Sequence, residues 1–274
     1  MTSQAPVLII GATAKTGVRV TDRLTVRGIA TRAVSRSSTP AFDWTRPETW
    51  ADALDGVSKA YVTYQPDLMV DGAADDIARL GAIARDKGVG QIVLLSGRGE
   101  PGAQRAERAL QESGVPWSIV RASWFNQNFS EGYLVDSILA GEVALPAGPV
   151  PEPFIDADDI ADVAVAALTD DRHLDRLYEV TGPRALTFAE AVAEIGAAAG
   201  RDIRYAEIGG ADFAAAMRPH VPGDVIAMLM ELFTVVLDGR NSAVAHGVEE
   251  ALGRKPRDFA DYVRATAATG VWQA

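Results

Sequence analysis

A run of aliphatic residues that leads directly into closely spaced glycines constrains the fold of this chain most. Val7 to Ile10 are aliphatic, Gly11 and Gly17 delimit the turn that follows, and the next residues favour a helix. In a parallel sheet, a buried strand passes in this way into the phosphate-binding N-terminus of a helix. An ordinary strand-to-helix turn is the alternative. A P-loop is excluded, because Lys15 and Thr16 are not preceded by glycine at the required spacing.

Two residues at the tip of the second predicted strand, Ser35 and Arg36, indicate which nucleotide such a turn would bind. An NAD-binding chain is expected to carry an acidic residue near this position, where it bonds the 2′-hydroxyl of the ribose. Here a small hydroxyl and a guanidinium stand instead. Arginine can form paired hydrogen bonds to a phosphate, whereas a carboxylate would repel it. The N-terminal region therefore predicts an NADP(H)-binding domain.

The composition is that of a globular protein, with 48% hydrophobic and 23% charged residues. The net charge of −11 argues against binding to nucleic acid or to an anionic membrane, since both require a basic surface. The absence of cysteine excludes disulfides and thiolate chemistry. No signal-like or membrane-spanning stretch is evident, so we expect a cytoplasmic protein. The oligomeric state is not predicted by any of these features.

The histidines give no indication of a metal site. His173, His220 and His246 are far apart in the sequence and have no partner at metal-ligand spacing. We therefore expect no bound metal and predict that all three are surface residues.

Apolar runs alternate with helical patterns over the first two thirds of the chain, which predicts parallel strands joined by right-handed crossovers. Strands are predicted at Val7–Ile10, Ala30–Val34, Lys59–Thr63, Gln91–Ser96 and Trp117–Arg121. Helices are predicted at Val18–Arg27, Pro47–Leu54, Gly72–Lys87 and Gly102–Glu112. The fold class is therefore α/β, a Rossmann-type doubly wound parallel sheet. We expect residues 1–155 to form the nucleotide-binding domain.

The pattern changes in the last third. Gly141–Pro153 is rich in glycine and proline and is predicted to be a loop, and a helix is expected over Asp156–Asp170. Thr187 and Glu190 form a capping box that opens another helix, and the chain is mainly helical after residue 211. Residues 156–274 are thus expected to supply the remaining sheet elements and a smaller, helix-rich C-terminal lobe that binds the substrate.

Several short motifs, taken together, resemble the NmrA-like group of atypical short-chain dehydrogenases/reductases. Within that group the chain is similar to the subfamily of the ergot-alkaloid enzymes festuclavine synthase and agroclavine dehydrogenase. The matching pieces are Lys15-Thr16, Ser35-Arg36-Ser37-Ser38, Phe42-Asp43-Trp44, Thr49-Trp50, Val93-Leu94-Leu95-Ser96, Trp124-Phe125, Asn128-Phe129, Ala157-Asp158-Asp159-Ile160-Ala161, Leu186-Thr187-Phe188 and Gly253-Arg254-Lys255-Pro256-Arg257. The chain departs from the group at Ala14, where glycine is usual, and at Thr63-Tyr64-Gln65-Pro66.

This resemblance implies a set of contacts to NADP(H). The pyrophosphate would be surrounded by Gly11, Thr13, Ala14, Lys15, Thr16 and Gly17. Ser35 and Arg36 would hold the 2′-phosphate, and Asp43 and Trp44 would border the adenine. Thr63 and Tyr64 would lie beside the nicotinamide ribose, since ligands bind at the carboxyl ends of parallel strands.

The residues that usually protonate the product of a short-chain dehydrogenase are missing. None of the six tyrosines is followed by lysine four residues later, so the Tyr-x-x-x-Lys pair is absent. Ser96 stands where the group keeps a serine, although a hydroxyl there could equally satisfy local backbone groups. Trp124 and Asn128 are expected to contact the substrate or the nicotinamide, whereas Phe125 and Phe129 fit core packing equally well.

These expectations describe an NADP(H)-dependent reductase. Its small-molecule substrate would be a planar electrophile, such as an imine or iminium, an activated carbonyl or a quinone. The alternative is an NmrA-like regulatory protein that senses NADP(H) without turnover.

Overall fold

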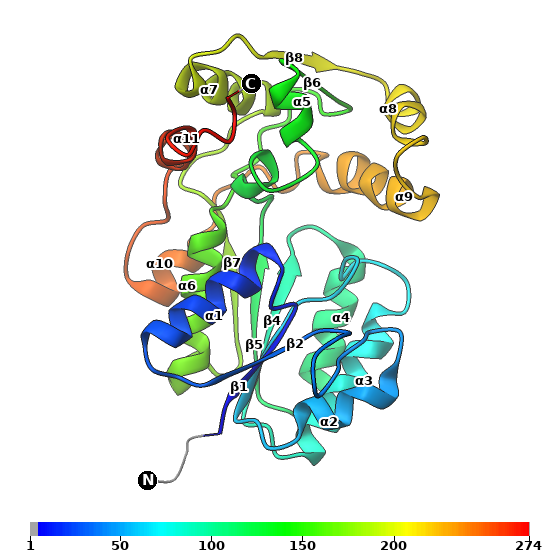
Figure 1. Cartoon of the computed structure of the whole chain (residues 1–274), viewed down its shortest axis with the longest axis vertical. Helices are drawn as coiled ribbons and strands as arrows, with labels where there is room; N and C mark the ends of the chain where they lie inside the picture. Colours follow the sequence, from blue (N-terminus) through cyan, green and yellow to red (C-terminus); the bar gives the residue numbers. More distant parts are fainter. Residues whose placement is uncertain (1–4, 274) are drawn as a thin grey trace. The chain divides into compact units, whose positions relative to one another are not determined.

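A six-stranded parallel sheet is the framework of the structure, a computed structural model that describes residues 5–273 (Figure 1). The strand order is β2-β1-β3-β4-β5-β7. The strands are β1 (Val7–Ile10), β2 (Thr31–Val34), β3 (Lys59–Val62), β4 (Ile92–Gly97), β5 (Trp117–Ala122) and β7 (Arg176–Val180). The predicted parallel sheet is therefore confirmed, with strand ends that differ by one residue or not at all.

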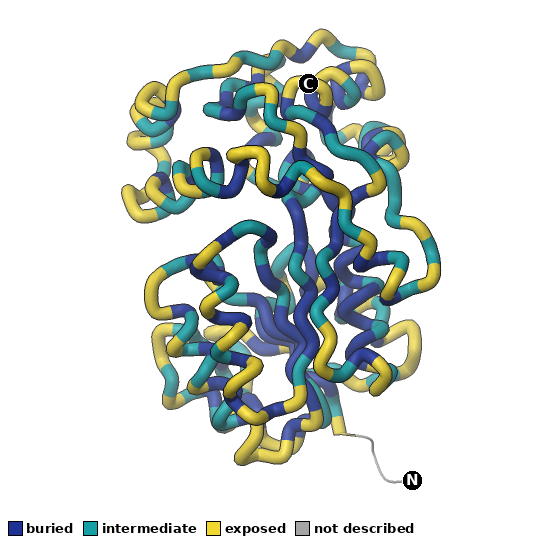
Figure 2. The backbone as a smooth tube through the Cα atoms, turned by 180° about the vertical axis from the view of Figure 1, so that it is seen from behind, coloured by how far each residue is buried: buried dark blue, intermediate teal, exposed yellow. Residues whose placement is uncertain are grey.

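Helices cover both faces of this sheet, which explains why its central strand β1 is continuously apolar. One face carries α1 (Lys15–Val26) and α6 (Ala157–Thr169), which pack against each other. The other carries α2 (Trp50–Leu54), α3 (Ala73–Asp86) and α4 (Pro101–Glu112). The four inner strands are mostly buried, whereas the edge strands β2 and β7 are partly exposed (Figure 2).

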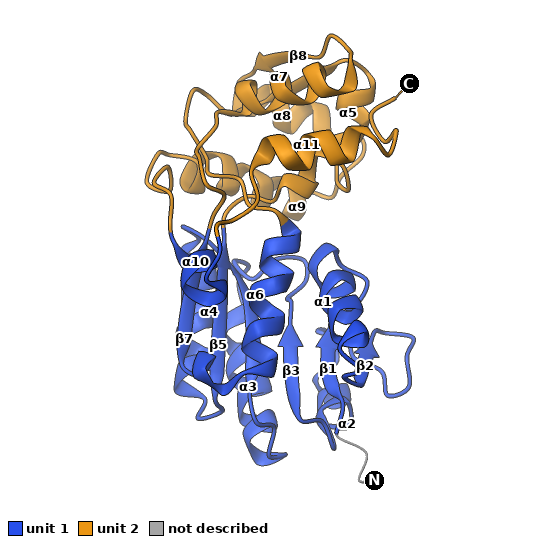
Figure 3. Cartoon of the chain, turned by 90° about the vertical axis from the view of Figure 1, so that its left-hand side faces the viewer, with its two compact units in different colours: residues 1–122, 157–180, 246–254 blue, residues 123–156, 181–245, 255–274 orange. Residues whose placement is uncertain are grey.

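The chain forms two compact units that interleave along the sequence (Figure 3). Unit 1 comprises residues 1–122, 157–180 and 246–254, and unit 2 comprises residues 123–156, 181–245 and 255–274. Unit 1 holds the parallel sheet, its helices and α10 (Gly247–Leu252). This division differs from a single cut at residue 155, because β7 joins the edge of the first sheet through pairing with β5.

Unit 2 is rich in helices and contains a second, two-stranded parallel sheet. Its helices are η2 (Asn126–Phe129), α5 (Val135–Leu139), α7 (Phe188–Ala199), α8 (Gly210–Met217), α9 (Gly223–Glu231), the π-helical turn η4 (Leu232–Val236) and α11 (Phe259–Ala267). Its core is aromatic, with the ring of Phe129 5.5 Å from that of Phe154 and 5.7 Å from that of Phe259. The capping box of Thr187 and Glu190 is confirmed.

Two sequence-based expectations were wrong. The segment predicted as a loop contains β6 (Glu142–Leu145), which pairs with β8 (Arg204–Glu207), because its alternate residues Val143 and Leu145 point into the core. His173 is buried rather than on the surface. Its Nδ1 lies 2.7 Å from the hydroxyl of Tyr178 in the edge strand β7, which follows the 3₁₀ turn Asp171–His173. Among the residues described, no helix has the length and apolar character that a membrane span needs.

Candidate functional site

The glycine turn after β1 is packed so closely that glycine is required at both of its ends. Gly11 has a φ of +82°, and a Cβ there would lie 1.9 Å from Oγ1 of Thr63. A Cβ on Gly17 would lie 2.1 Å from the carbonyl oxygen of Gly11. The turn and the first residues of α1 are thus pressed against β1 and the end of β3. In a dinucleotide-binding turn, such close packing lets the phosphates of the nucleotide approach the backbone.

The N-terminus of α1 opens directly from this turn. Ala14 is the N-cap residue, in an extended conformation, and its backbone N–H donates to the carbonyl of Gly11 over 2.9 Å. Among the described residues, no side chain forms a capping hydrogen bond at the N-terminus of this helix, and no acidic residue lies in its first turn. The positive end of the helix dipole lies at this N-terminus, which suits an anion. Thr13 is exposed and Thr16 is buried.

The strand order places this turn at a topological switch point. β1 pairs with β2 on one side and with β3 on the other, so chain connections leave in opposite directions there. Open α/β sheets bind ligands at such points, outside the carboxyl ends of the strands. Gly11 and Thr63 follow the paired residues Ile10 and Val62, and the Thr63 hydroxyl donates to the carbonyl of Ile10 over 3.2 Å.

Ser35 and Arg36 follow the end of β2, next to β1. Because Val34 pairs with Ile10, Ser35 and Gly11 are the next residues on two adjacent strands. The turn is held by Ser38, whose hydroxyl accepts from the Ser35 backbone N–H at 2.8 Å. Ser35 and Arg36 are both exposed. The Arg36 guanidinium forms no hydrogen bond or ion pair with the residues that the structure describes. Its fork of donors is available to an anion.

An aromatic group lies beside this edge of unit 1. The Trp44 ring is 4.9 Å from that of Phe42, 5.4 Å from that of Trp50 and 4.4 Å from that of Tyr64. Asp43 has a local structural role, since its carboxylate accepts from the Thr45 backbone at 3.0 Å, a bond that lowers its pKa. The structure thus brings together Trp44 and Tyr64, which the sequence analysis expects at different parts of the cofactor.

The hydroxyl of Tyr64 is held by an acidic residue that the sequence analysis did not single out for this role. It donates to Oδ2 of Asp76 over 2.6 Å. Burial and this carboxylate together raise the pKa of Tyr64. The tyrosine is therefore a poorer proton donor than an exposed one.

Ser96 belongs to a buried network of charged residues in unit 1. Its hydroxyl donates to Oε1 of Glu107 over 2.6 Å, and the Nε of Arg121 donates to the same oxygen over 2.9 Å. Arg121 also bonds Glu179, which accepts from Arg98 at 2.6 Å. The bond to Glu107 raises the pKa of Arg121. The sequence analysis did not identify Glu107. Its position in a helix that packs on the sheet is a signal that could have indicated a buried, hydrogen-bonded carboxylate.

Trp124 and Asn128 lie in unit 2, whereas all the other predicted site residues lie in unit 1. The partly exposed Trp124 ring is 5.3 Å from that of Phe188 and 5.2 Å from that of Phe233. Asn128 is partly exposed in η2, where its backbone N–H donates to the carbonyl of Phe125 over 3.0 Å. Phe129 is fully buried, as a core residue would be.

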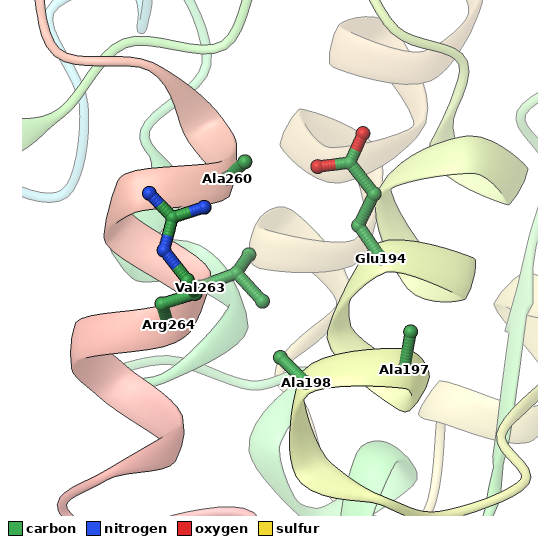
Figure 4. Close-up of a pocket in the computed structure, with 6 residues that line it drawn as sticks. All are labelled: Glu194, Ala197, Ala198, Ala260, Val263 and Arg264. Carbon is green, nitrogen blue, oxygen red and sulfur yellow. The ribbon is translucent and has the colours of Figure 1, made fainter.

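A surface pocket of about 250 Å³ lies between α7 and α11, and none of the predicted site residues lines it (Figure 4). It is lined by Glu194, Ala197, Ala198, Ala260, Val263 and Arg264. The carboxylate of Glu194 is already bonded to the guanidinium of Arg184, at 2.7 and 2.8 Å. The remaining lining is mostly alanine, so the pocket offers little for recognition.

Comparison with known proteins gives matches that cover more than half of the chain in every case. A family model described as the NmrA-like family matches residues 104–263. The NAD(P)H azoreductase of Xenophilus azovorans is 32% identical, with 96% of this chain and 98% of the relative covered. Festuclavine dehydrogenase of Aspergillus fumigatus is 29% identical, with 93% and 96% covered. The crystal structure of Citrobacter sp. triphenylmethane reductase complexed with NADP(H) has a TM-score of 0.81 at 18% identity, with 95% and 99% covered.

Proposed function

Because this chain belongs to the NmrA-like family, we propose that it is an NADP(H)-dependent reductase of a small, planar electrophile. Its relatives include proteins named azoreductase and festuclavine dehydrogenase, which supports oxidoreductase activity. The observation that carries the proposal is the glycine turn at the switch point of the sheet, where Gly11 and Gly17 leave no room for side chains.

The residues of unit 1 fit NADP(H) on this structure. Backbone N–H groups from Gly11 to Gly17 would hold the pyrophosphate at the N-terminus of α1. Ser35 and Arg36 would hold the 2′-phosphate, and Trp44, in contact with Tyr64, would border the adenine. Bound NADPH supplies a hydride, and the chain orients the two reactants and excludes water.

The hydrogen bonds of Ser96 and Tyr64, two hydroxyls predicted at the site, favour a hydride acceptor that needs no proton. Ser96 donates to Glu107 and Tyr64 donates to Asp76, so both protons are already committed to carboxylates. Reduction of a ketone produces an alkoxide that requires a proton donor or oxyanion donors. Reduction of an iminium ion produces a neutral amine. We therefore place an iminium or a readily protonated imine first among the substrate classes.

Trp124 would provide an aromatic face for such a substrate. Its ring is partly exposed and is braced by Phe188 and Phe233. A cation over an indole ring gains about 0.5–2 kcal/mol. Asn128, partly exposed on the next turn, would fix the orientation of the substrate or of the nicotinamide.

Oxidation of NADPH followed by absorbance, against matched imines, quinones and ketones, tests this proposal. Turnover of at least one class, lost in Gly17→Ala, is the expected result. Tight NADPH binding without oxidation by any acceptor would instead favour the alternative, a regulatory protein that senses NADP(H).

A further inference from the structure

Asp76 is a carboxylate that the proposed function does not use, although it holds a side chain of the predicted cofactor site. It lies in the first turn of α3, in unit 1, and its Oδ2 accepts from the Tyr64 hydroxyl over 2.6 Å. Tyr64 follows the carboxyl end of β3, so the bond joins a strand end to a neighbouring helix. Hydrogen bonds to charged groups are stronger than those between neutral groups. This bond therefore fixes the orientation of the Tyr64 ring.

The Tyr64 ring contacts Trp44, whose loop is fixed independently. The two ring centroids are 4.4 Å apart. In the loop that carries Trp44, the Asp43 carbonyl accepts from Nε1 of Trp50 over 2.8 Å. The backbone N–H of Asp43 donates to Oγ1 of Thr49 over 3.2 Å. Because Trp44 and Tyr64 are both partly exposed, they form an aromatic surface that a planar group can reach.

The position of Arg36 decides which end of the cofactor this surface would meet. Ser35 and Arg36 are proposed to hold the 2′-phosphate, which NADP(H) carries on the ribose of its adenosine half. The Phe42 backbone N–H donates to the carbonyl of Ser35 over 2.9 Å, so the loop that carries Trp44 is bonded to this phosphate turn. The base nearest the 2′-phosphate is adenine, whose face can stack on aromatic side chains. The aromatic surface of Trp44 and Tyr64 thus fits the adenine better than the nicotinamide.

We propose that Asp76 is a positioning residue that, through the Tyr64 hydroxyl, fixes the aromatic surface on which the adenine of NADP(H) lies. This assigns Tyr64 to the adenine end of the cofactor, whereas the sequence analysis expects it beside the nicotinamide ribose. A surface that is fixed before binding raises affinity, because less side-chain freedom is lost when the ligand binds. The inference rests on the proposed function in that unit 1 is taken to bind NADP(H).

Calorimetric titration with adenosine 2′,5′-bisphosphate, which has the adenine and the 2′-phosphate but no nicotinamide, tests this inference. Asp76→Ala and Tyr64→Phe should each bind it about tenfold more weakly than wild type, since each removes the same hydrogen bond to a charged group. Asp76→Asn should keep most of the affinity, because its amide oxygen can still accept from the tyrosine. The double variant Tyr64→Phe/Asp76→Ala should bind no more weakly than either single variant.

Asp75→Ala is the matched control. Asp75 lies in the same first turn of α3 and is exposed, so its removal takes the same charge from the same end of the helix. Its affinity for the bisphosphate should equal that of wild type. Equal losses in the Asp75 and Asp76 variants would show that the charge of the helix end matters and not the bond to Tyr64, which would overturn the proposal. Failure of wild type to bind the bisphosphate would overturn it as well.

Titration of the same variants with NADPH separates the two ends of the cofactor. If Tyr64 contacts the adenine, Asp76→Ala should lose affinity for NADPH by the same factor as for the bisphosphate. A loss for NADPH alone would place Tyr64 beside the nicotinamide ribose and overturn the proposal. Unchanged affinity of Asp76→Ala and Tyr64→Phe for both ligands would also overturn it.

These results are separable from the proposed function. Binding of the bisphosphate that depends on Asp76, without oxidation of NADPH by any acceptor, would support the adenine surface and contradict the reductase proposal. Oxidation of NADPH together with bisphosphate binding that is independent of Asp76 would contradict only the inference about Asp76.

Discussion

Ser96 and Glu107 are joined by a hydrogen bond of 2.6 Å in the interior of unit 1, with the serine as donor. Arg121 donates to both oxygens of the same carboxylate, so these oxygens act as acceptors in the network. Ser96 can consequently offer a ligand only its lone pairs. This bond favours a structural role, or a role as hydrogen-bond acceptor, for a serine whose catalytic role stays a prediction.

The first prediction follows from this relationship and from its counterpart at Tyr64 and Asp76. Ser96→Ala and Tyr64→Phe should each retain measurable turnover of NADPH, because neither hydroxyl has a free proton to give. Steady-state kinetics of both variants check this, with NADPH affinity measured alongside. A loss of turnover beyond the 10²–10⁴-fold typical of a general acid, with cofactor binding intact, would identify the missing proton donor.

Arg36→Ala should remove most of the preference for NADPH over NADH. The guanidinium at this exposed site is expected to contribute about 1.5–3 kcal/mol to phosphate binding, or roughly ten- to a hundred-fold in affinity. Titration of both cofactors into wild type and variant measures it. Arg46→Ala is the matched control, since Arg46 is exposed and forms a local ion pair with Glu48. Equal affinities of wild type for the two cofactors would contradict the assignment.

Gly11→Ala should abolish NADPH binding and destabilise the fold more than Gly28→Ala does. Both glycines have positive φ, at +82° and +71°, so each substitution carries a backbone cost of about 1–2 kcal/mol. Only at Gly11 would the new Cβ also collide with Thr63, whereas nothing lies within 4 Å at Gly28. Urea unfolding and cofactor titration of both variants check this. Similar losses in the two would refute the close packing of the turn.

Matched imine and ketone substrates should be reduced at different rates. A preformed cyclic iminium is expected to have the higher kcat/KM than an unactivated ketone of similar size, since its product needs no proton. The comparison is made with the same ring system in both members of each pair. If ketones or quinones were faster by tenfold or more, the iminium assignment would be wrong while the reductase assignment would survive.

The stability of the protein should fall in acid partly through His173. Burial lowers the pKa of this histidine below its ordinary value of 6.5. The unfolded chain therefore binds a proton that the native protein resists, so stability decreases as the pH falls below about 6.5. Urea unfolding of wild type and His173→Gln between neutral and acid pH measures this contribution. His220→Gln is the control at an exposed site, and identical pH dependence in all three proteins would argue against it.

Local sequence patterns predicted much of the nucleotide-binding region. The strand run before Gly11 and the capping box at Thr187 are confirmed because each depends on residues within a few positions of one another. The fold class is confirmed for a similar reason, since alternating strand and helix patterns permit few topologies. The roles assigned to the individual site residues remain predictions.

By itself, the sequence determined the parallel sheet, the glycine turn and the arginine after the second strand, because these rest on local periodicity and chain order. Only the tertiary structure decided which hydrogen-bonding groups have partners. Ser96 meets Glu107 because α4 packs on β4, and Tyr64, which follows β3, meets Asp76 in the first turn of α3. Asn126 is left without a partner although its neighbour Gln127 has one. Hydrogen bonds between elements depend on positions in space that residue type and spacing do not specify.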